Sequence, residues 1–168
     1  GFLPSHLGAL VHLLDVIGAR LTVDEGVTVH PRKAPLVPFE LSTLPYPGFA
    51  TDLQAQMCVL AAHIPGLSLI TEKIYPNRFM HVPELERLGA RIVVEGPTAI
   101  VQGSPQRLRG AHVMASDLRA SAALYLAGLV AEGETVIHRV YHVDRGYEDF
   151  DQKWRSLGAQ LERCRENG

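Results

Sequence analysis

Residues 46–56, Tyr-Pro-Gly-Phe-Ala-Thr-Asp-Leu-Gln-Ala-Gln, join a loop to the first turn of a helix, and the rest of the chain is organised around this stretch. Its proline and glycine disfavour regular structure and mark the loop. Thr51 is a favourable N-cap, and Gln54 stands three residues later, as in a capping box. Apolar residues follow at helical spacing. The sequence therefore predicts a helix that begins at Thr51 and holds the carboxylate of Asp52 at an exposed rim.

The same pattern occurs a second time. Asp117 stands in the run Ser-Asp-Leu-Arg-Ala, 65 residues after Asp52, and again precedes an apolar helical stretch. Arg78 and Arg145 follow the two acids by 26 and 28 residues, each after the next expected strand. A single acid at a helix start more often only complements the helix dipole, and a single arginine is more often a solvated surface residue. Their recurrence instead indicates one structural unit used more than once.

The hydropathy pattern predicts three strands, a helix, a strand and a helix, run through twice behind one leading helix. A Gly-Ala pair ends helices at residues 18, 89 and 158. No linker or low-complexity segment divides residues 1–168, so we expect a single α/β domain with sheets outside and helices packed within or against them. The expected helices span residues 5–17, 51–64, 80–88, 117–130 and 147–157, and the expected strands span residues 19–23, 27–30, 36–41, 67–74, 91–95, 98–102, 107–114, 134–143 and 160–163.

Composition narrows the functional classes. Hydrophobic residues make up 46% of the chain and charged residues 20%, which is typical of a soluble globular protein. A formal net charge of −2 argues against a general nucleic-acid-binding surface, because such surfaces need many Lys and Arg contacts to phosphates. No apolar run approaches the ~20 residues of a membrane-spanning helix, and the first residues lack the basic region of a signal peptide. We therefore expect a cytoplasmic protein with no nucleic-acid or membrane partner.

Cysteines and histidines do not indicate a metal site. Cys58 falls inside the helix that Asp52 opens, where a small buried apolar side chain is a better interpretation than a nucleophile. Cys164 stands at the end of the last expected strand, before the polar tail. His138 and His142 would share one face of a strand, but four residues apart they are too distant to share a metal easily. We expect no bound metal.

Four segments together resemble the UDP-N-acetylglucosamine enolpyruvyl transferases (UDP-N-acetylglucosamine 1-carboxyvinyltransferases). They are Pro-Gly-Phe-Ala-Thr-Asp-Leu-Gln-Ala-Gln from residue 47, Glu-Lys-Ile-Tyr-Pro-Asn-Arg-Phe-Met-His-Val-Pro-Glu-Leu from residue 72, Met-Ala-Ser-Asp-Leu-Arg-Ala-Ser from residue 114 and Tyr-His-Val-Asp-Arg-Gly-Tyr-Glu from residue 141. The resemblance covers residues 7–165. It implies an inside-out α/β barrel domain of repeated βββαβα units, pseudo-threefold and incomplete at its N-terminus, which is the C-terminal, substrate-side domain of a two-domain enzyme.

The activity that this resemblance implies is transfer of the enolpyruvyl group of phosphoenolpyruvate to the 3-hydroxyl of UDP-N-acetylglucosamine. Phosphate is released, no metal or redox cofactor is needed, and the reaction is the first committed step of peptidoglycan biosynthesis. In the family, the other domain supplies a loop with a catalytic cysteine, and neither Cys58 nor Cys164 stands in that context. We therefore expect this chain alone to be inactive, and we expect its exposed apolar edges to allow self-association.

The resemblance also assigns roles to single residues. Asp52 matches the acid proposed to remove the proton of the sugar 3-hydroxyl, which is work that a placed carboxylate can do. Ile74 matches a position that contacts the sugar nucleotide through its backbone. Arg145 matches the arginine that meets the carboxylate of phosphoenolpyruvate, as a guanidinium fork suits a carboxylate. Further positions in the substrate cleft are matched by Arg78, Asp117 and Arg119.

A second hypothesis remains at this point: a non-catalytic module that binds a nucleotide sugar or a protein partner on the same fold. The two hypotheses differ in what they require of the candidate residues. Convergence of Asp52, Asp117, Arg78 and Arg145 on one face favours the enzyme. Their dispersal over several faces favours a binding or structural role.

Overall fold

The computed structural model describes residues 4–106 and 108–164, and its elements follow the predicted order. The first repeat contains β1 (Arg20–Val23), β2 (Val27–His30), β3 (Glu40–Ser42), α2 (Gln54–Ala62), β4 (Gly66–Thr71) and α3 (Val82–Arg87). The second contains β5 (Ile92–Glu95), β6 (Thr98–Gly103), β7 (His112–Met114), α4 (Leu118–Val130), β8 (Val136–His138) and α6 (Phe150–Ser156). The remaining elements are α1 (Gly8–Val16), a short α5 (Tyr141–Asp144) and the 3-10 turns η1 (Pro4–Leu7) and η2 (Thr51–Leu53).

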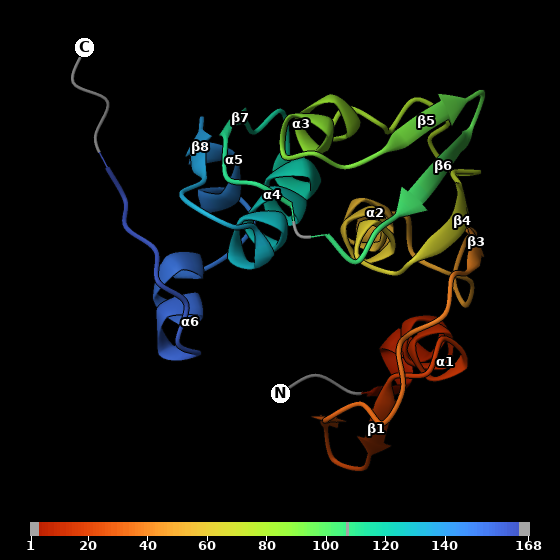
Figure 1. The fold of residues 1–168 in the computed structure, drawn as a ribbon. Coiled ribbons are helices and arrows are strands. Elements are labelled where there is room, and N and C mark those ends of the chain that lie inside the picture. Colours follow the sequence, from red (N-terminus) through yellow and green to blue (C-terminus); the bar gives the residue numbers. More distant parts are fainter. Residues whose placement is uncertain (1–3, 107, 165–168) are drawn as a thin grey trace.

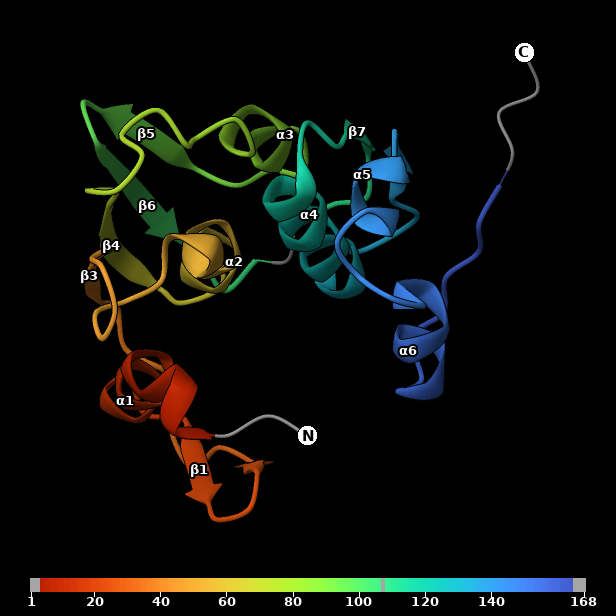
Figure 2. The ribbon, with the colours of Figure 1, turned by 180° about the vertical axis from the view of Figure 1, so that it is seen from behind.

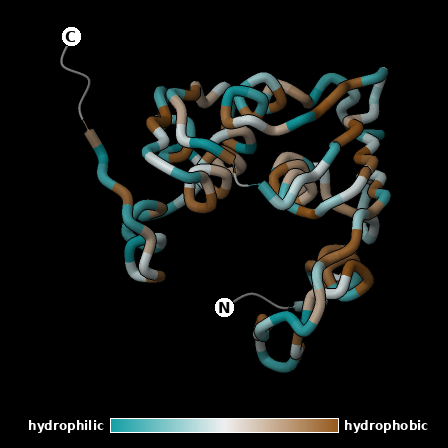
Figure 3. The backbone as a smooth tube through the Cα atoms, in the orientation of Figure 1, coloured by the Kyte–Doolittle hydropathy of each residue, from teal (hydrophilic) through white to brown (hydrophobic). Residues whose placement is uncertain are grey.

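The chain forms an open arc, with α1 and the β1–β2 hairpin at one end and α6 at the other (Figures 1 and 2). Helices α2 and α4 pack against each other in the middle, and α2 also packs against β4 and β6. Strands thus lie outside the paired helices. Along the arc, α1 is largely hydrophobic, whereas the tip of the β1–β2 hairpin is hydrophilic (Figure 3).

The central sheet joins the two repeats. Its strand order is β3-β4-β6-β5, in which β3 and β4 are parallel and β5 and β6 form an antiparallel hairpin. The parallel pair therefore comes from the first repeat and the hairpin from the second. The other two sheets are the hairpin β1–β2 and the parallel pair β7–β8. The β1–β2 sheet has the pairing of the hairpin in the central sheet, and the β7–β8 sheet has the pairing of its parallel half.

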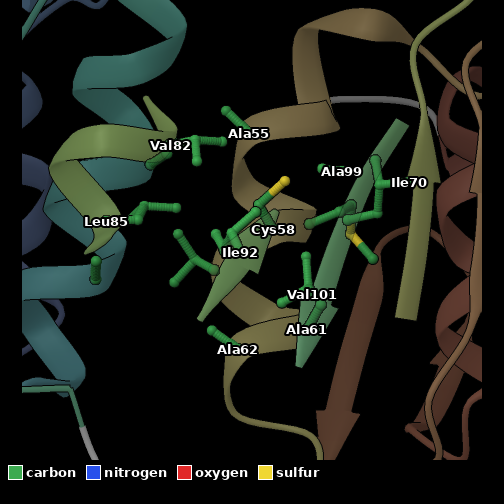
Figure 4. Packing of buried hydrophobic residues seen from close by; sticks show 14 of the residues in the cluster. Ala55, Cys58, Ala61, Ala62, Ile70, Val82, Leu85, Ile92, Ala99 and Val101 are labelled. Atoms are coloured by element: carbon green, nitrogen blue, oxygen red, sulfur yellow. The ribbon is translucent and has the colours of Figure 1, made fainter. Parts of the chain in front are cut away.

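Small side chains let α2 approach the sheet closely (Figure 4). Gly103, at the end of β6, has no space for a side chain, because a Cβ there would lie 1.9 Å from the carbonyl oxygen of Ile64. At this close approach, α2 and the sheet pack together without room for a further side chain. The core residues at this contact are Ala55, Cys58, Ala61 and Ala62 of α2, Val82 and Leu85 of α3, and Ile70, Ile92, Ala99 and Val101 of the strands.

The recurring Gly-Ala pair ends three helices in the same way. Gly18, Gly89 and Gly158 have φ values of 96°, 93° and 93°, in the left-handed region that glycine adopts without strain. In each case the alanine N–H donates to the carbonyl five residues back and the glycine N–H to the carbonyl three residues back. These are the two bonds of a Schellman motif. The sequence repeat is therefore a repeat of structure.

Four predictions about the elements are wrong. The strand expected over residues 36–41 forms only from Glu40, as β3 (Glu40–Ser42). The strand expected over residues 134–143 is β8 followed by α5, because Arg139 has a φ of 59° that breaks the extended backbone. No strand forms over residues 160–163, so Cys164 is not in one. The expected strand 107–114 is ordered as a strand only over β7, and residue 107 lies outside the described residues.

Candidate active site

Asp52 lies where side chains from the two repeats come into contact. It lies in η2, and its side chain is 63% exposed. The guanidinium Nε of Arg119, at the start of α4, donates to Oδ1 of Asp52. Nη1 of Arg78, from the corner after β4, lies 3.7 Å from the same oxygen. An exposed carboxylate is thus held by one arginine from each repeat.

Arg78 is itself fixed from two further sides. Its Nη1 donates to the hydroxyl oxygen of Thr51 at 2.8 Å. Its guanidinium carbon lies 4.0 Å from the centroid of the Tyr75 ring, a cation–π contact. Only 18% of the Arg78 side chain is exposed, so its charge is held in one place at the edge of the site.

Glu72 is a fully buried carboxylate beneath this cluster. It accepts hydrogen bonds from the hydroxyls of Thr43 (2.6 Å) and Thr51 (2.7 Å) and from the backbone N–H groups of Ile74 (2.8 Å) and Tyr75 (2.9 Å). Burial raises the pKa of Glu72, but these bonds together lower it below its ordinary value. The buried side chain is therefore held as a carboxylate.

The predicted capping box is wrong, because Thr51 has a different partner. The turn η2 begins after Ala50 without a side-chain cap, and the Thr51 hydroxyl donates to Glu72 instead. Gln54 does not reach back either, since its side chain is fully buried and its polar atoms have no hydrogen-bond partner among the described residues. The helix start at Asp52 is thus fixed by tertiary contacts and not by a local cap.

Asp117 does cap its helix. Its carboxylate accepts from the backbone N–H groups of Arg119 (2.7 Å) and Ala120 (3.0 Å) at the start of α4. The two acids of the sequence repeat therefore differ in role. Asp117 orients the first turn of the helix from which the Arg119 side chain reaches Asp52.

Arg145 lies on the loop after α5 and is exposed. Its guanidinium carbon is 5.4 Å from the centroid of the Tyr141 ring, and among the described residues it makes no ion pair with Asp52. The loop nevertheless packs against the start of α4, because a Cβ on Gly146 would lie 2.5 Å from Leu118. The structure thus joins Asp52, Arg78 and Arg119 directly and leaves Arg145 outside this cluster.

Sequence reasoning missed two further residues near the cluster. Burial raises the pKa of Tyr147, the negative charge of Asp52 raises it further, and the positive charge of Arg119 opposes both. His81 is 2% exposed, and its burial lowers its pKa to about 4 although the charge of Asp117 opposes the change. Both residues, like Glu72, lie inside the segments that carry the resemblance, but spacing alone gives them no role.

In the described part of the chain, cysteine and metal-binding side chains do not form a second candidate active site or a metal site. Burial raises the pKa of Cys58 to about 12, so its thiol is not a nucleophile near neutral pH. Residues 4–106 and 108–164 contain no group of three or more His, Cys, Asp and Glu side chains that could hold a metal ion. Within the same residues, every helix is too short or too polar to cross a bilayer.

The surface beside the cluster is open. A hollow lies between residues 5–10 and the loop over residues 46–53, and Asp52, whose side chain is 63% exposed, is not one of the residues that line it. The carboxylate therefore stands at an open rim and is not enclosed.

Comparison with known proteins gives several close sequence relatives. The UDP-N-acetylglucosamine 1-carboxyvinyltransferase of Azorhizobium caulinodans is 57% identical over 154 residues, which is 89% of this chain and 36% of the relative. The protein with the same name from an Anaeromyxobacter species is 54% identical over 164 residues, which is 97% of this chain and 38% of the relative. The chain thus spans little more than a third of the length of these relatives.

Solved structures agree with the sequence relatives. The enolpyruvyl transferase NikO from Streptomyces tendae matches with a TM-score of 0.85 at 36% identity, over 93% of this chain and 36% of that one. An EPSP synthase from Acinetobacter baumannii matches with a TM-score of 0.68 at 19% identity, which shows a shared fold. The family model for EPSP synthase (3-phosphoshikimate 1-carboxyvinyltransferase) matches residues 2–154. With its α/β fold and these matches, the chain belongs to the EPSP synthase family of enolpyruvyl transferases.

Proposed function

We propose that this chain is the C-terminal, substrate-side domain of an enzyme that transfers the enolpyruvyl group of phosphoenolpyruvate to UDP-N-acetylglucosamine. The names and identities of the curated relatives support this substrate pair. The contact of Asp52 with Arg119 and Arg78 is the observation that carries the proposal, because it combines a base with fixed positive charge. In this proposal the enzyme acts in the cytoplasm, at the first committed step of peptidoglycan biosynthesis.

In this proposal Asp52 accepts the proton of the sugar 3-hydroxyl. The freed oxygen forms a bond to the enolpyruvyl carbon, the bond from that carbon to the phosphate oxygen breaks, and inorganic phosphate leaves with the proton that Asp52 had accepted. Asp52 suits the role because its carboxylate is exposed yet fixed by two guanidinium groups. The reaction needs no metal or redox cofactor.

The remaining candidate residues bind the substrates. Arg78, Arg119 and Arg145 supply positive charge for the phosphate and carboxylate groups. The N–H of Ile74 already donates to Glu72, so we place its contact with the sugar nucleotide on its carbonyl oxygen. Asp117 contributes by holding the first turn of α4 beside the site.

A chimera tests this function. We would replace the aligned 164 residues of the Anaeromyxobacter relative with this chain, which gives the domain the rest of an enzyme to close against. We expect phosphate release that requires both phosphoenolpyruvate and UDP-N-acetylglucosamine, and none from the 168-residue chain alone. A folded chimera that binds the nucleotide sugar without turnover would instead support a non-catalytic binding module.

A further inference from the structure

Glu72 ties together three segments that build the candidate site, although it does not touch Asp52. Through its carboxylate it connects Thr43 after β3, Thr51 in η2, and the corner at residues 74–75 that leads to Arg78. The side chain is fully buried, and all of these contacts are hydrogen bonds to a charged acceptor. Such bonds are shorter and stronger than those between neutral groups.

A chain of hydrogen bonds leads from Glu72 through Thr51 to Arg78 at the surface. The Thr51 hydroxyl donates its only proton to Oε2 of Glu72, so its lone pairs face outward. One of them accepts the bond from Nη1 of Arg78 at 2.8 Å. The same Nη1 lies 3.7 Å from Oδ1 of Asp52. The orientation of Arg78 toward Asp52 thus depends on an acceptor at the Glu72 position.

We propose that Glu72 is a positioning residue for the reaction proposed above, on which this inference rests. Its carboxylate fixes the Thr51 hydroxyl as an acceptor for Arg78 and thereby holds Arg78 and Asp52 in one arrangement before substrate binds. It acts through these residues and does not itself contact substrate.

The isosteric substitution Glu72→Gln separates positioning from simple structural support. The amide oxygen of glutamine can replace Oε1 and keep the bonds from Thr43, Ile74 and Tyr75. Its NH₂ group then meets Thr51 as a donor, where Oε2 had been an acceptor. The Thr51 proton then loses its acceptor, and the hydroxyl must rotate to accept from the new NH₂ group, which turns the lone pair that binds Nη1 of Arg78.

Ser68→Ala is the matched control. Ser68 is also fully buried in β4, and its hydroxyl oxygen accepts a bond from the N–H of Phe39 at 3.2 Å. The substitution removes a buried hydrogen bond beside the same strand without touching Thr51 or Arg78. Any general effect of weakening this part of the sheet appears in both variants.

The first measurement is steady-state kinetics in the chimera. We expect Glu72→Gln to lower kcat by about 10- to 100-fold with the KM for UDP-N-acetylglucosamine unchanged, since small misplacement of reacting groups has effects of this size. Thr51→Val should lower kcat similarly, and the double variant should lose no more than either one, because both break the same connection. Ser68→Ala should keep the wild-type kcat. Equal kcat losses in Glu72→Gln and Ser68→Ala, or additive losses in the double variant, would overturn the proposal.

The second measurement does not depend on turnover. In ¹⁵N-edited spectra of the 168-residue chain, we expect the guanidinium protons of Arg78 to exchange slowly with water in the wild type and in Ser68→Ala, and quickly in Glu72→Gln. An Arg78→Lys variant assigns the signal. Unchanged exchange in Glu72→Gln would refute the proposal. A wild-type chimera without turnover would refute the proposed function, while these spectra would still show whether Glu72 positions Arg78.

Discussion

Arg119 of the second repeat donates its guanidinium Nε to the carboxylate of Asp52 in the first repeat. The two residues are 67 positions apart in the sequence, and each stands at the start of a buried helix. The packing of α2 against α4 therefore sets the distance between an acid and a positive charge. In this fold, the repeat creates the candidate site as well as the core.

The first prediction concerns Asp52 as the base. In the chimera, we expect Asp52→Asn to lower kcat by about 10²- to 10⁴-fold, because an amide cannot accept the hydroxyl proton. The melting temperature should stay near that of the wild type, since the side chain is 63% exposed. Phosphate release and thermal melting would be measured on the same preparation. Turnover close to the wild-type value would remove Asp52 from the mechanism.

The second prediction distinguishes the two acids of the repeat. Asp117→Ala removes the N-cap of α4 and should lower the free energy of unfolding by about 0.5–2 kcal/mol. Asp52→Ala is the matched control and should have a smaller effect, because Asp52 does not cap its helix. Urea titrations followed by circular dichroism would measure both. Equal losses would mean that the two acids have the same structural role.

The third prediction concerns the approach of β6 to α2. Gly103→Ala places a Cβ 1.9 Å from the carbonyl oxygen of Ile64, and backbone must move to accommodate it. We expect a loss of about 1–3 kcal/mol in the free energy of unfolding, as for overpacked cores. Gly26→Ala is the control, because a Cβ there meets no atom within 4 Å. Equal free energies of unfolding in the two variants would show that β6 does not approach α2 this closely in the folded protein.

The fourth prediction is a dependence of stability on pH through His81. Burial lowers the pKa of His81 from 6.5 to about 4 in the folded chain, so the unfolded chain binds the extra proton between these pH values. The free energy of unfolding should therefore fall as the pH falls from 6.5 to 4, by about 1.4 kcal/mol for each unit of pKa shift. His81→Gln should flatten this dependence. The exposed His12→Gln serves as its control, and an equal flattening in both variants would argue against His81 as the source.

The order of helices and strands could be predicted from the sequence because hydropathy and Gly-Ala pairs are local signals. The capping box failed because Thr51 bonds to Glu72, which is 21 residues away and invisible to local rules. The strand over residues 134–143 failed at Arg139, where a non-glycine residue adopts a positive φ that no propensity predicts.

The candidate site was predictable in part. The spacing of the acids and arginines singled out Asp52, Asp117, Arg78 and Arg145, and resemblance added Arg119 and Ile74. Spacing could not predict that Asp117 caps its helix whereas Asp52 forms ion pairs. The two acids differ in the groups that lie near them in the folded chain, and these groups come from other segments for Asp52. Glu72 had no local signal at all, since its importance comes from partners in three separate segments.

The central sheet takes its parallel pair from the first repeat and its hairpin from the second. A cut between the repeats, near residue 90, would therefore divide a sheet and not fall between two finished modules. Neither piece could keep the β4–β6 pairing, which is the longest strand ladder described. Folding of the two repeats is for this reason mutually dependent, unlike that of solenoid proteins whose units stack as separate blocks.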